Sequence, residues 1–175
     1  MKGVKVLRKS KRIVAIDPGT TESGYVVADH ETLRPLMFGK IPNEEILGMI
    51  AEHTSDDDDF VIEMIASYGM PVGREVFDTV VWIGRFVQFI TDQGMSQPTF
   101  VYRRDEKMTI CHSPKANDAT IRQALIDMFA YGTPNKGKGT KKSPGWFYGF
   151  RADVWQAYAV AVTYRMKEKW KGETE

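Results

Sequence analysis

The stretch that decides the fold is Val14-Ala15-Ile16-Asp17-Pro18-Gly19-Thr20-Thr21. Its apolar half predicts a buried strand, and its second half predicts a tight turn, because proline and glycine directly follow the aspartate. A carboxylate at the end of a buried strand stands on rigid backbone and faces the crevice at the edge of the sheet. Asp17 is therefore the first candidate for a functional side chain.

The remaining chain shows three strand patterns first and then alternating helices and strands. Strands are expected at 12–16, 24–28, 36–41, 60–63 and 99–102. Helices are expected at 44–53 with Asn43 as N-cap, and at 74–90, 116–129 and 152–169. This order predicts an α/β fold in which a five-stranded mixed sheet carries helices on both faces.

Length and composition favour one soluble globular domain over residues 1–175. Apolar residues make up 42% and charged residues 27% of the chain, which argues against disorder. No apolar run approaches the roughly 20 residues of a membrane span, so no membrane partner is expected. The single cysteine, Cys111, excludes internal disulfides and fits a reducing cytoplasm.

The formal net charge of +1 conceals two basic segments. One is an N-terminal arm at 1–11, which lacks the apolar region of a signal peptide. The other is a Gly-rich loop at 131–145, whose lysines are Lys136, Lys138, Lys141 and Lys142. Both segments could follow the backbone of a polyanion. The alternative, that these lysines are simply solvated, stays open from the sequence alone.

Two further acids stand where they could meet Asp17. Glu63 ends the predicted strand at 60–63, and Asp153 opens the last predicted helix. Either acid alone has an ordinary explanation, as a solvated strand end or as a charge that complements the helix dipole. Small residues such as Ala157 would let this helix pack closely on the sheet and aim Asp153 at the strand ends. Three convergent carboxylates can hold divalent cations against a phosphodiester.

The helix expected at 74–90 carries two apolar stripes. We expect the stripe of Val76, Val80, Gly84 and Val87 to face the core. The opposite stripe needs a cover, either another part of this chain or a partner subunit, and we expect it to lie in a homodimer interface. Its members are Trp82, Phe86 and Phe89.

Four segments resemble, in the same order, motifs of the RuvC-type Holliday junction resolvases in the RNase H-like superfamily. They are 13–20 with Asp17, 61–63 with Glu63, 113–122 with Lys115 and Arg122, and 153–161 with Asp153. The resemblance implies an RNase H-like sheet, a homodimer, divalent metal ions and cleavage of branched DNA. It also implies that Asp17, Glu63 and Asp153 are metal ligands. The family often has a fourth acid where this chain has Gln156.

The expected mechanism uses two Mg²⁺ ions, with Mn²⁺ as a substitute, to activate water and stabilise the leaving oxygen. Lys115 could stabilise charge in the transition state, although a plain surface lysine is an equal alternative. Tyr68 could wedge against bases at the crossover. The expected contacts to DNA are Tyr68, Lys115, Arg122, Lys136, Lys138, Lys141 and Lys142.

Two other functions fit parts of the same pattern. The loss of the fourth acid allows a non-catalytic module that binds branched DNA on a nuclease fold. The turn at 17–21 also resembles the phosphate-binding loop of sugar kinases and actin-like ATPases. Those proteins enclose a nucleotide between two such lobes, and this chain has length for only one.

Overall fold

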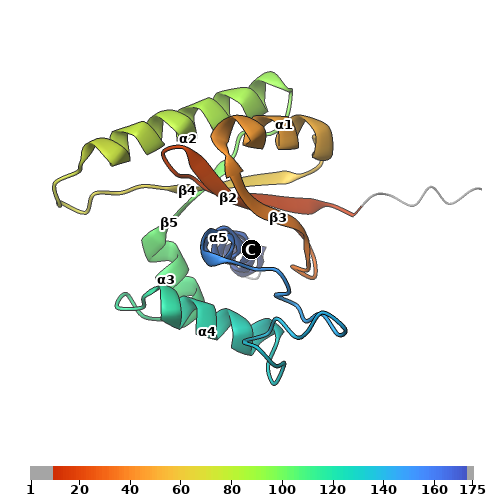
Figure 1. Ribbon diagram of the computed structural model, residues 1–175. Coiled ribbons are helices and arrows are strands. Elements are labelled where there is room, and N and C mark those ends of the chain that lie inside the picture. The colour runs from red at the N-terminus through yellow and green to blue at the C-terminus, as the bar shows by residue number, and fades with distance from the viewer. Residues whose placement is uncertain (1–9, 173–175) are drawn as a thin grey trace, which may run out of the picture.

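The computed structural model describes residues 10–172, and Figure 1 shows their arrangement. Most of the basic arm expected at 1–11 lies outside the described residues. Its last member, Lys11, places Nζ 2.7 Å from Oδ1 of Asp59. The neighbouring Arg12 donates from Nε to Oδ1 of the buried Asp58 at 3.0 Å. Both basic side chains therefore pair within the protein.

Five strands form one mixed sheet in the order β3-β2-β1-β4-β5. Their bounds are β1 Arg12–Asp17, β2 Glu22–Asp29, β3 Pro35–Pro42, β4 Asp59–Met64 and β5 Thr99–Tyr102. β1 pairs antiparallel with β2 and parallel with β4, while β2–β3 is antiparallel and β4–β5 is parallel. The predicted α/β fold with a five-stranded mixed sheet is thereby confirmed.

Five helices cover the two faces of the sheet (Figure 1). α1 Asn43–His53 and α2 Arg74–Asp92 lie on one face. The other face carries α3 Arg103–Cys111, α4 Asp118–Phe129 and α5 Ala152–Gly172. Within residues 10–172, none of the helices combines the length and apolarity needed to cross a membrane.

β1 lies at the centre of the sheet and is buried from both sides. Ile13 and Ala15 face the cluster under α5, whereas Val14 and Ile16 face the cluster under α1 and α2. This double burial explains why the strand reads as a continuous apolar run. The cluster under α5 is rich in packed aromatic rings: Phe147, Phe150, Trp155 and Tyr158.

One helix is absent from the sequence-based prediction. α3 follows β5 directly, and most of its sequence, Arg103-Arg104-Asp105-Glu106-Lys107-Met108, is charged. Such a short charged segment shows no apolar stripe, so periodicity does not reveal it. A capping box between Tyr102 and Asp105 starts the helix and is the local signal that could have indicated it.

The buried face of α2 lies between the two stripes of the sequence-based prediction, so each stripe is wrong in part. The helix buries Thr79, Ile83, Phe86 and Ile90 against the sheet. Phe86 is fully buried, and Trp82 and Phe89 pack partly buried against the same core. Phe86 therefore cannot form the expected interface, whereas Trp82 and Phe89 keep part of their surface exposed. Of the stripe expected in the core, Val76 and Val87 are half-buried, but Gly84 is exposed and Val80 is 42% exposed. The face of α2 that is buried in the core includes Thr79, so a search for apolar residues alone does not identify this face.

Asn43 does not cap α1 as expected. The helix begins at Asn43 itself, its N-cap is Pro42, and no side chain caps it. The Asn43 side chain is buried and turns instead toward the loop after β1.

Candidate active site

Asp17 and Glu63 lie side by side at the carboxyl ends of two parallel strands. Ile16 of β1 pairs with Ile62 of β4 in the parallel ladder. Asp17 and Glu63 are the next residues on these strands, so they also lie beside each other. Burial raises the pKa of the Asp17 carboxyl, which is also close enough to Glu63 for the Glu63 charge to raise its pKa further. The sequence-based expectation that these two acids meet is confirmed.

Gly24 of β2 allows the start of α5, which carries Asp153, to pack close to Asp17. Gly24 pairs with Asp17 across the β1–β2 ladder. A Cβ atom on Gly24 would stand only 2.6 Å from the carbonyl oxygen of Asp153, so the start of α5 packs directly on the strand. The Asp153 carboxylate is 2.5 Å from Nζ of Lys40 on β3. The third predicted acid therefore lies beside the first two.

The turn after β1 is held by a small buried network. Ser23 Oγ donates to Oδ1 of Asn43 at 2.6 Å and accepts from the Gly19 amide at 3.2 Å. Asn43 Nδ2 donates to the Gly19 carbonyl at 3.0 Å. A Cβ on Gly19 would meet the Glu22 carbonyl oxygen at 2.2 Å, so the turn requires glycine. This network fixes the backbone that follows Asp17.

A fourth acid, Glu106, joins the site from α3, the helix that the sequence pattern does not predict. Its side chain is fully buried, and Oε2 pairs with Arg103. Oε1 is buried without a hydrogen-bond partner among the described residues. The Glu63 charge is the strongest electrostatic influence on Glu106. An unpaired buried oxygen beside Glu63 is an available cation ligand.

Arg103 contacts three polar side chains on this side of the site. Its guanidinium donates to Glu106, to Asp118 at the start of α4, and to Oε1 of Gln156 at 3.3 Å. Gln156 thus lies near the acids as expected, but its oxygen is engaged by Arg103. The site also contains Lys40, whereas Lys115 is exposed and forms no ion pair with these acids among residues 10–172.

Two of the four acids, Asp17 and Glu106, resist ionisation in the protein alone. Burial, reinforced by the charge of Glu63, raises the pKa of Asp17 to about 9. Burial and Glu63 also raise the pKa of Glu106 to about 8, although Arg103 opposes this shift. Clustered oxygens that resist ionisation fit a site for divalent cations, whose charge would favour the carboxylate forms.

The loop after β4 places Tyr68 at the mouth of a basic pocket. Tyr68 is 58% exposed and adopts a positive φ of 46°, which is uncommon for a residue other than glycine. The pocket has a volume of about 200 Å³, and Arg103, Arg104 and Lys107 contribute to its lining. The sequence-based prediction named Tyr68 but not these basic residues, because they lie on α3, which it did not include.

The remaining basic residues divide into two groups. Lys136, Lys141 and Lys142 are exposed and Lys138 is half-buried in a loop that Gly139 and Pro144 close by a β-bridge. Arg122 instead places its guanidinium 5.4 Å from the centre of the Trp155 ring, with Nε buried. The structure therefore gives Arg122 a packing role.

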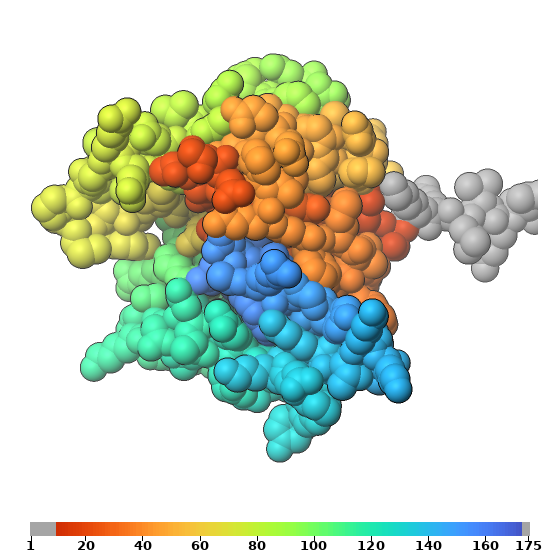
Figure 2. Space-filling model, viewed as in Figure 1, coloured from red at the N-terminus to blue at the C-terminus, as the bar shows by residue number. Residues whose placement is uncertain are grey.

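A second cavity adjoins Asp153 between β3 and the start of α5. It has a volume of about 460 Å³ and is lined in part by Lys40, Arg151 and Asp153. Figure 2 shows the start of α5 at the surface below the turn between β1 and β2. The acid cluster thus borders a surface that carries basic side chains.

Comparison with solved structures identifies the fold. RuvC from Thermus thermophilus in complex with a Holliday junction substrate superposes with a TM-score of 0.65 at 14% identity, covering 92% of this chain and 96% of that one. A second Thermus thermophilus RuvC structure gives a TM-score of 0.66 at 13% identity, covering 91% and 96%. No family model and no curated protein sequence matches the chain. The chain has the RNase H-like fold of RuvC.

Proposed function

We propose that the protein is a metal-dependent endonuclease that cleaves branched DNA, with Holliday junctions as its main substrate. The observation that carries this proposal is the convergence of Asp17, Glu63 and Asp153 at one edge of the sheet. The fold supports it, because a RuvC of the same fold has been solved with a Holliday junction substrate. A non-catalytic protein that binds branched DNA could have the same fold, but it would not need three acids at one point.

We propose two Mg²⁺ ions as cofactors, with Mn²⁺ as a substitute. When bound, such a pair activates water and stabilises the leaving oxygen of an in-line displacement. Asp17 would hold both ions because it lies between Glu63 and Asp153, which would each hold one. The buried Oε1 of Glu106 would supply the negative charge that Gln156 lacks. Gln156 would serve as a weaker ligand only after its oxygen leaves Arg103.

We propose that DNA lies across the basic surface beside the acids. Tyr68 would stack on a base at the branch point, and Arg104 and Lys107 would hold the adjacent phosphates. Lys115 and the lysines of the 131–145 loop would contact backbone farther away, with binding that weakens as salt increases. The Arg103 guanidinium already borders the acids, so it is better placed than Lys115 to offset charge on the scissile phosphate.

We propose a homodimer built on the exposed side of α2. Phe77 and Val81 are about 60% exposed and Val80 is 42% exposed, and the three lie on one face of the helix. This face replaces the interface of Trp82, Phe86 and Phe89 expected from the sequence. A two-fold dimer would present two active sites to the two related strands of a four-way junction.

The experiment that tests the function is cleavage of a synthetic four-way junction in Mg²⁺. Metal-dependent nicking of paired strands supports the nuclease. Binding without nicking in either Mg²⁺ or Mn²⁺ supports the non-catalytic alternative.

A further inference from the structure

A second group of metal-ligand side chains lies at the opposite edge of the sheet from the acids of the candidate active site. His30 follows β2, Asp59 begins β4, and Glu168 lies in the last part of α5. One ligand atom from each lies within 4.8 Å of the others. The six residues of β1 separate this group from Asp17 by roughly 17–20 Å.

The facing atoms are His30 Nε2, Asp59 Oδ2 and Glu168 Oε2. His30 Nε2 lies 3.2 Å from the Asp59 oxygen and 3.1 Å from the Glu168 oxygen. Metal–ligand bonds of about 2.0–2.2 Å in a tetrahedron separate neighbouring ligand atoms by about 3.3–3.5 Å. The two carboxylate oxygens therefore lie nearly as far from His30 Nε2 as neighbouring ligands on one metal ion do.

The other polar atom of each ligand is already held by a neighbour. His30 Nδ1 lies 2.9 Å from Oε1 of Glu31, and Asp59 Oδ1 pairs with Lys11. Glu168 Oε1 accepts a hydrogen bond from the Tyr164 hydroxyl at 3.0 Å. In metal sites, a ligating histidine commonly donates the N–H of its non-ligating ring nitrogen to a carboxylate. This hydrogen bond fixes the tautomer in which the other ring nitrogen can bind the metal.

The atoms of these three side chains that face one another have hydrogen-bonding capacity that is not fully used. His30 is only 9% exposed, and Asp59 Oδ2 is buried with no hydrogen-bond partner among the described residues. His30 Nε2 faces two carboxylate oxygens at 3.2 and 3.1 Å, and a cation among these three atoms would be a ligand partner for all of them. Three carboxylates also outnumber the two cations of the cluster, Lys11 and Arg165.

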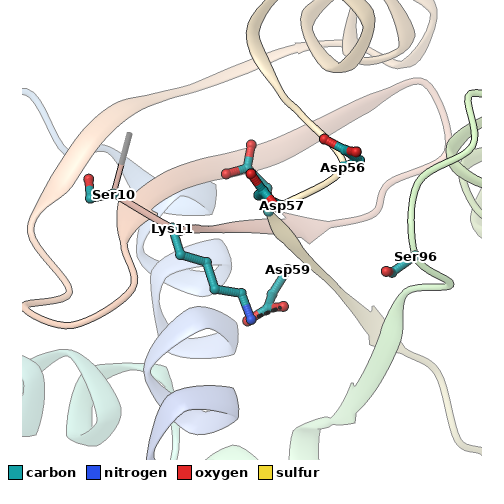
Figure 3. Close-up of a pocket in the computed structure, with 7 residues that line it drawn as sticks. Ser10, Lys11, Asp56, Asp57, Asp59 and Ser96 are labelled. Atoms are coloured by element: carbon teal, nitrogen blue, oxygen red, sulfur yellow. Dashed lines mark ion pairs between the residues drawn. The ribbon is translucent and has the colours of Figure 1, made fainter. Parts of the chain in front are cut away.

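We propose that His30, Asp59 and Glu168 form a binding site for a single Zn²⁺ ion. One imidazole nitrogen with two carboxylate oxygens favours zinc over magnesium, which prefers oxygen ligands alone. The fourth position would belong to water. Figure 3 shows the adjoining pocket of about 760 Å³, to which Lys11 and Asp59 contribute.

The ion would fasten three segments that are distant in the sequence. It would link the end of β2 and the start of β4 to the far part of α5, whose first turn carries Asp153. Its effect would therefore be on stability, through preferential binding to the folded chain. This site is independent of the proposed nuclease activity.

The test is calorimetric titration of the full chain with Zn²⁺ in excess Mg²⁺, which occupies the all-oxygen acids. The wild type should bind one Zn²⁺ per chain, and His30→Gln should weaken that binding at least about 100-fold. Glu31→Gln, which alters the partner of Nδ1 and removes the ion pair with Arg165 but leaves all three ligands in place, should weaken it about 10–100-fold. The exposed His53, which also lies beside a glutamate, provides the matched control, and His53→Gln should bind like the wild type.

Two outcomes overturn the proposal. A wild type that takes up no Zn²⁺ means that His30 only pairs with the neighbouring carboxylates. If Zn²⁺ binds His30→Gln as tightly as it binds the wild type, the zinc site lies elsewhere in the protein. If His30→Gln does not fold, Glu168→Gln replaces it, and wild-type protein loaded with Co²⁺ should show the intense visible bands of a low-coordinate ion. Weak, octahedral-type bands contradict the site.

Discussion

Gly24 of β2 lies so close to Asp153 of α5 that a Cβ atom would stand 2.6 Å from the Asp153 carbonyl oxygen. Gly24→Ala should therefore push the start of α5 away from the strand. We expect a loss of about 1–3 kcal/mol in the free energy of unfolding and a large loss of cleavage. Urea unfolding and a junction-nicking assay measure the two effects. Gly48→Ala in α1 is the control, because nothing lies within 4 Å of its Cβ position. Equal behaviour of the two variants contradicts the packing account.

Glu106 supplies the fourth carboxylate of the candidate site. Glu106→Gln keeps an oxygen for Arg103 and removes the negative charge. Because ligand charge governs cation affinity, the Mg²⁺ concentration for half-maximal cleavage should rise about tenfold. Metal titration of the cleavage rate measures this, with the exposed Glu52→Gln as the control. A curve that coincides with that of the wild type removes Glu106 from the metal site.

The stability of the metal-free protein should fall as pH rises. Burial and the neighbouring Glu63 raise the pKa of Asp17 from 3.8 to about 9. Between these values the folded state binds more protons than the unfolded state, so ionisation favours unfolding. We expect the wild type in EDTA to lose at least about 1 kcal/mol between about pH 5 and pH 8, and Asp17→Asn to lose clearly less. Urea unfolding at each pH measures both, and equal slopes for Asp17→Asn and the exposed control Asp57→Asn would exclude Asp17 as the cause.

The exposed side of α2 provides the prediction on assembly. Val81 is 61% exposed within the chain, so Val81→Glu leaves the core intact and places a charge in the proposed interface. The wild type should sediment as a dimer at micromolar concentration, and Val81→Glu as a monomer with unchanged circular dichroism. Gln97→Glu adds the same charge in an exposed loop and should remain dimeric. A monomeric wild type contradicts the proposal.

The sequence predicted most of the fold because β1 and β4 are buried on both faces. Their apolar runs end in acids, and the register of Ile16 with Ile62 then brings Asp17 and Glu63 together. The long elements and their order follow from ordinary periodicity.

Residues whose roles depend on tertiary packing could not be predicted. Glu106 and Arg103 lie on a short charged helix without periodicity, so the fourth acid of the site was missed. Asn43 looks like a cap in sequence but is used by the Gly19 turn, which lies 24 residues earlier. Phe86 shows how two apolar stripes on one helix leave its rotation undetermined until the sheet is present.

The central claim is that the acids at the ends of β1, β4 and α5 hold the metal ions that cleave branched DNA. The most direct measurement compares wild type and Asp17→Asn on a labelled four-way junction in Mg²⁺, with binding in Ca²⁺ recorded for both. The account predicts that the wild type nicks paired strands, while Asp17→Asn binds the junction with similar affinity and cuts at least about 1,000-fold more slowly. Wild-type cutting that persists in Asp17→Asn, or a wild type that binds the junction and never cuts it with Mg²⁺ or Mn²⁺, would contradict the account.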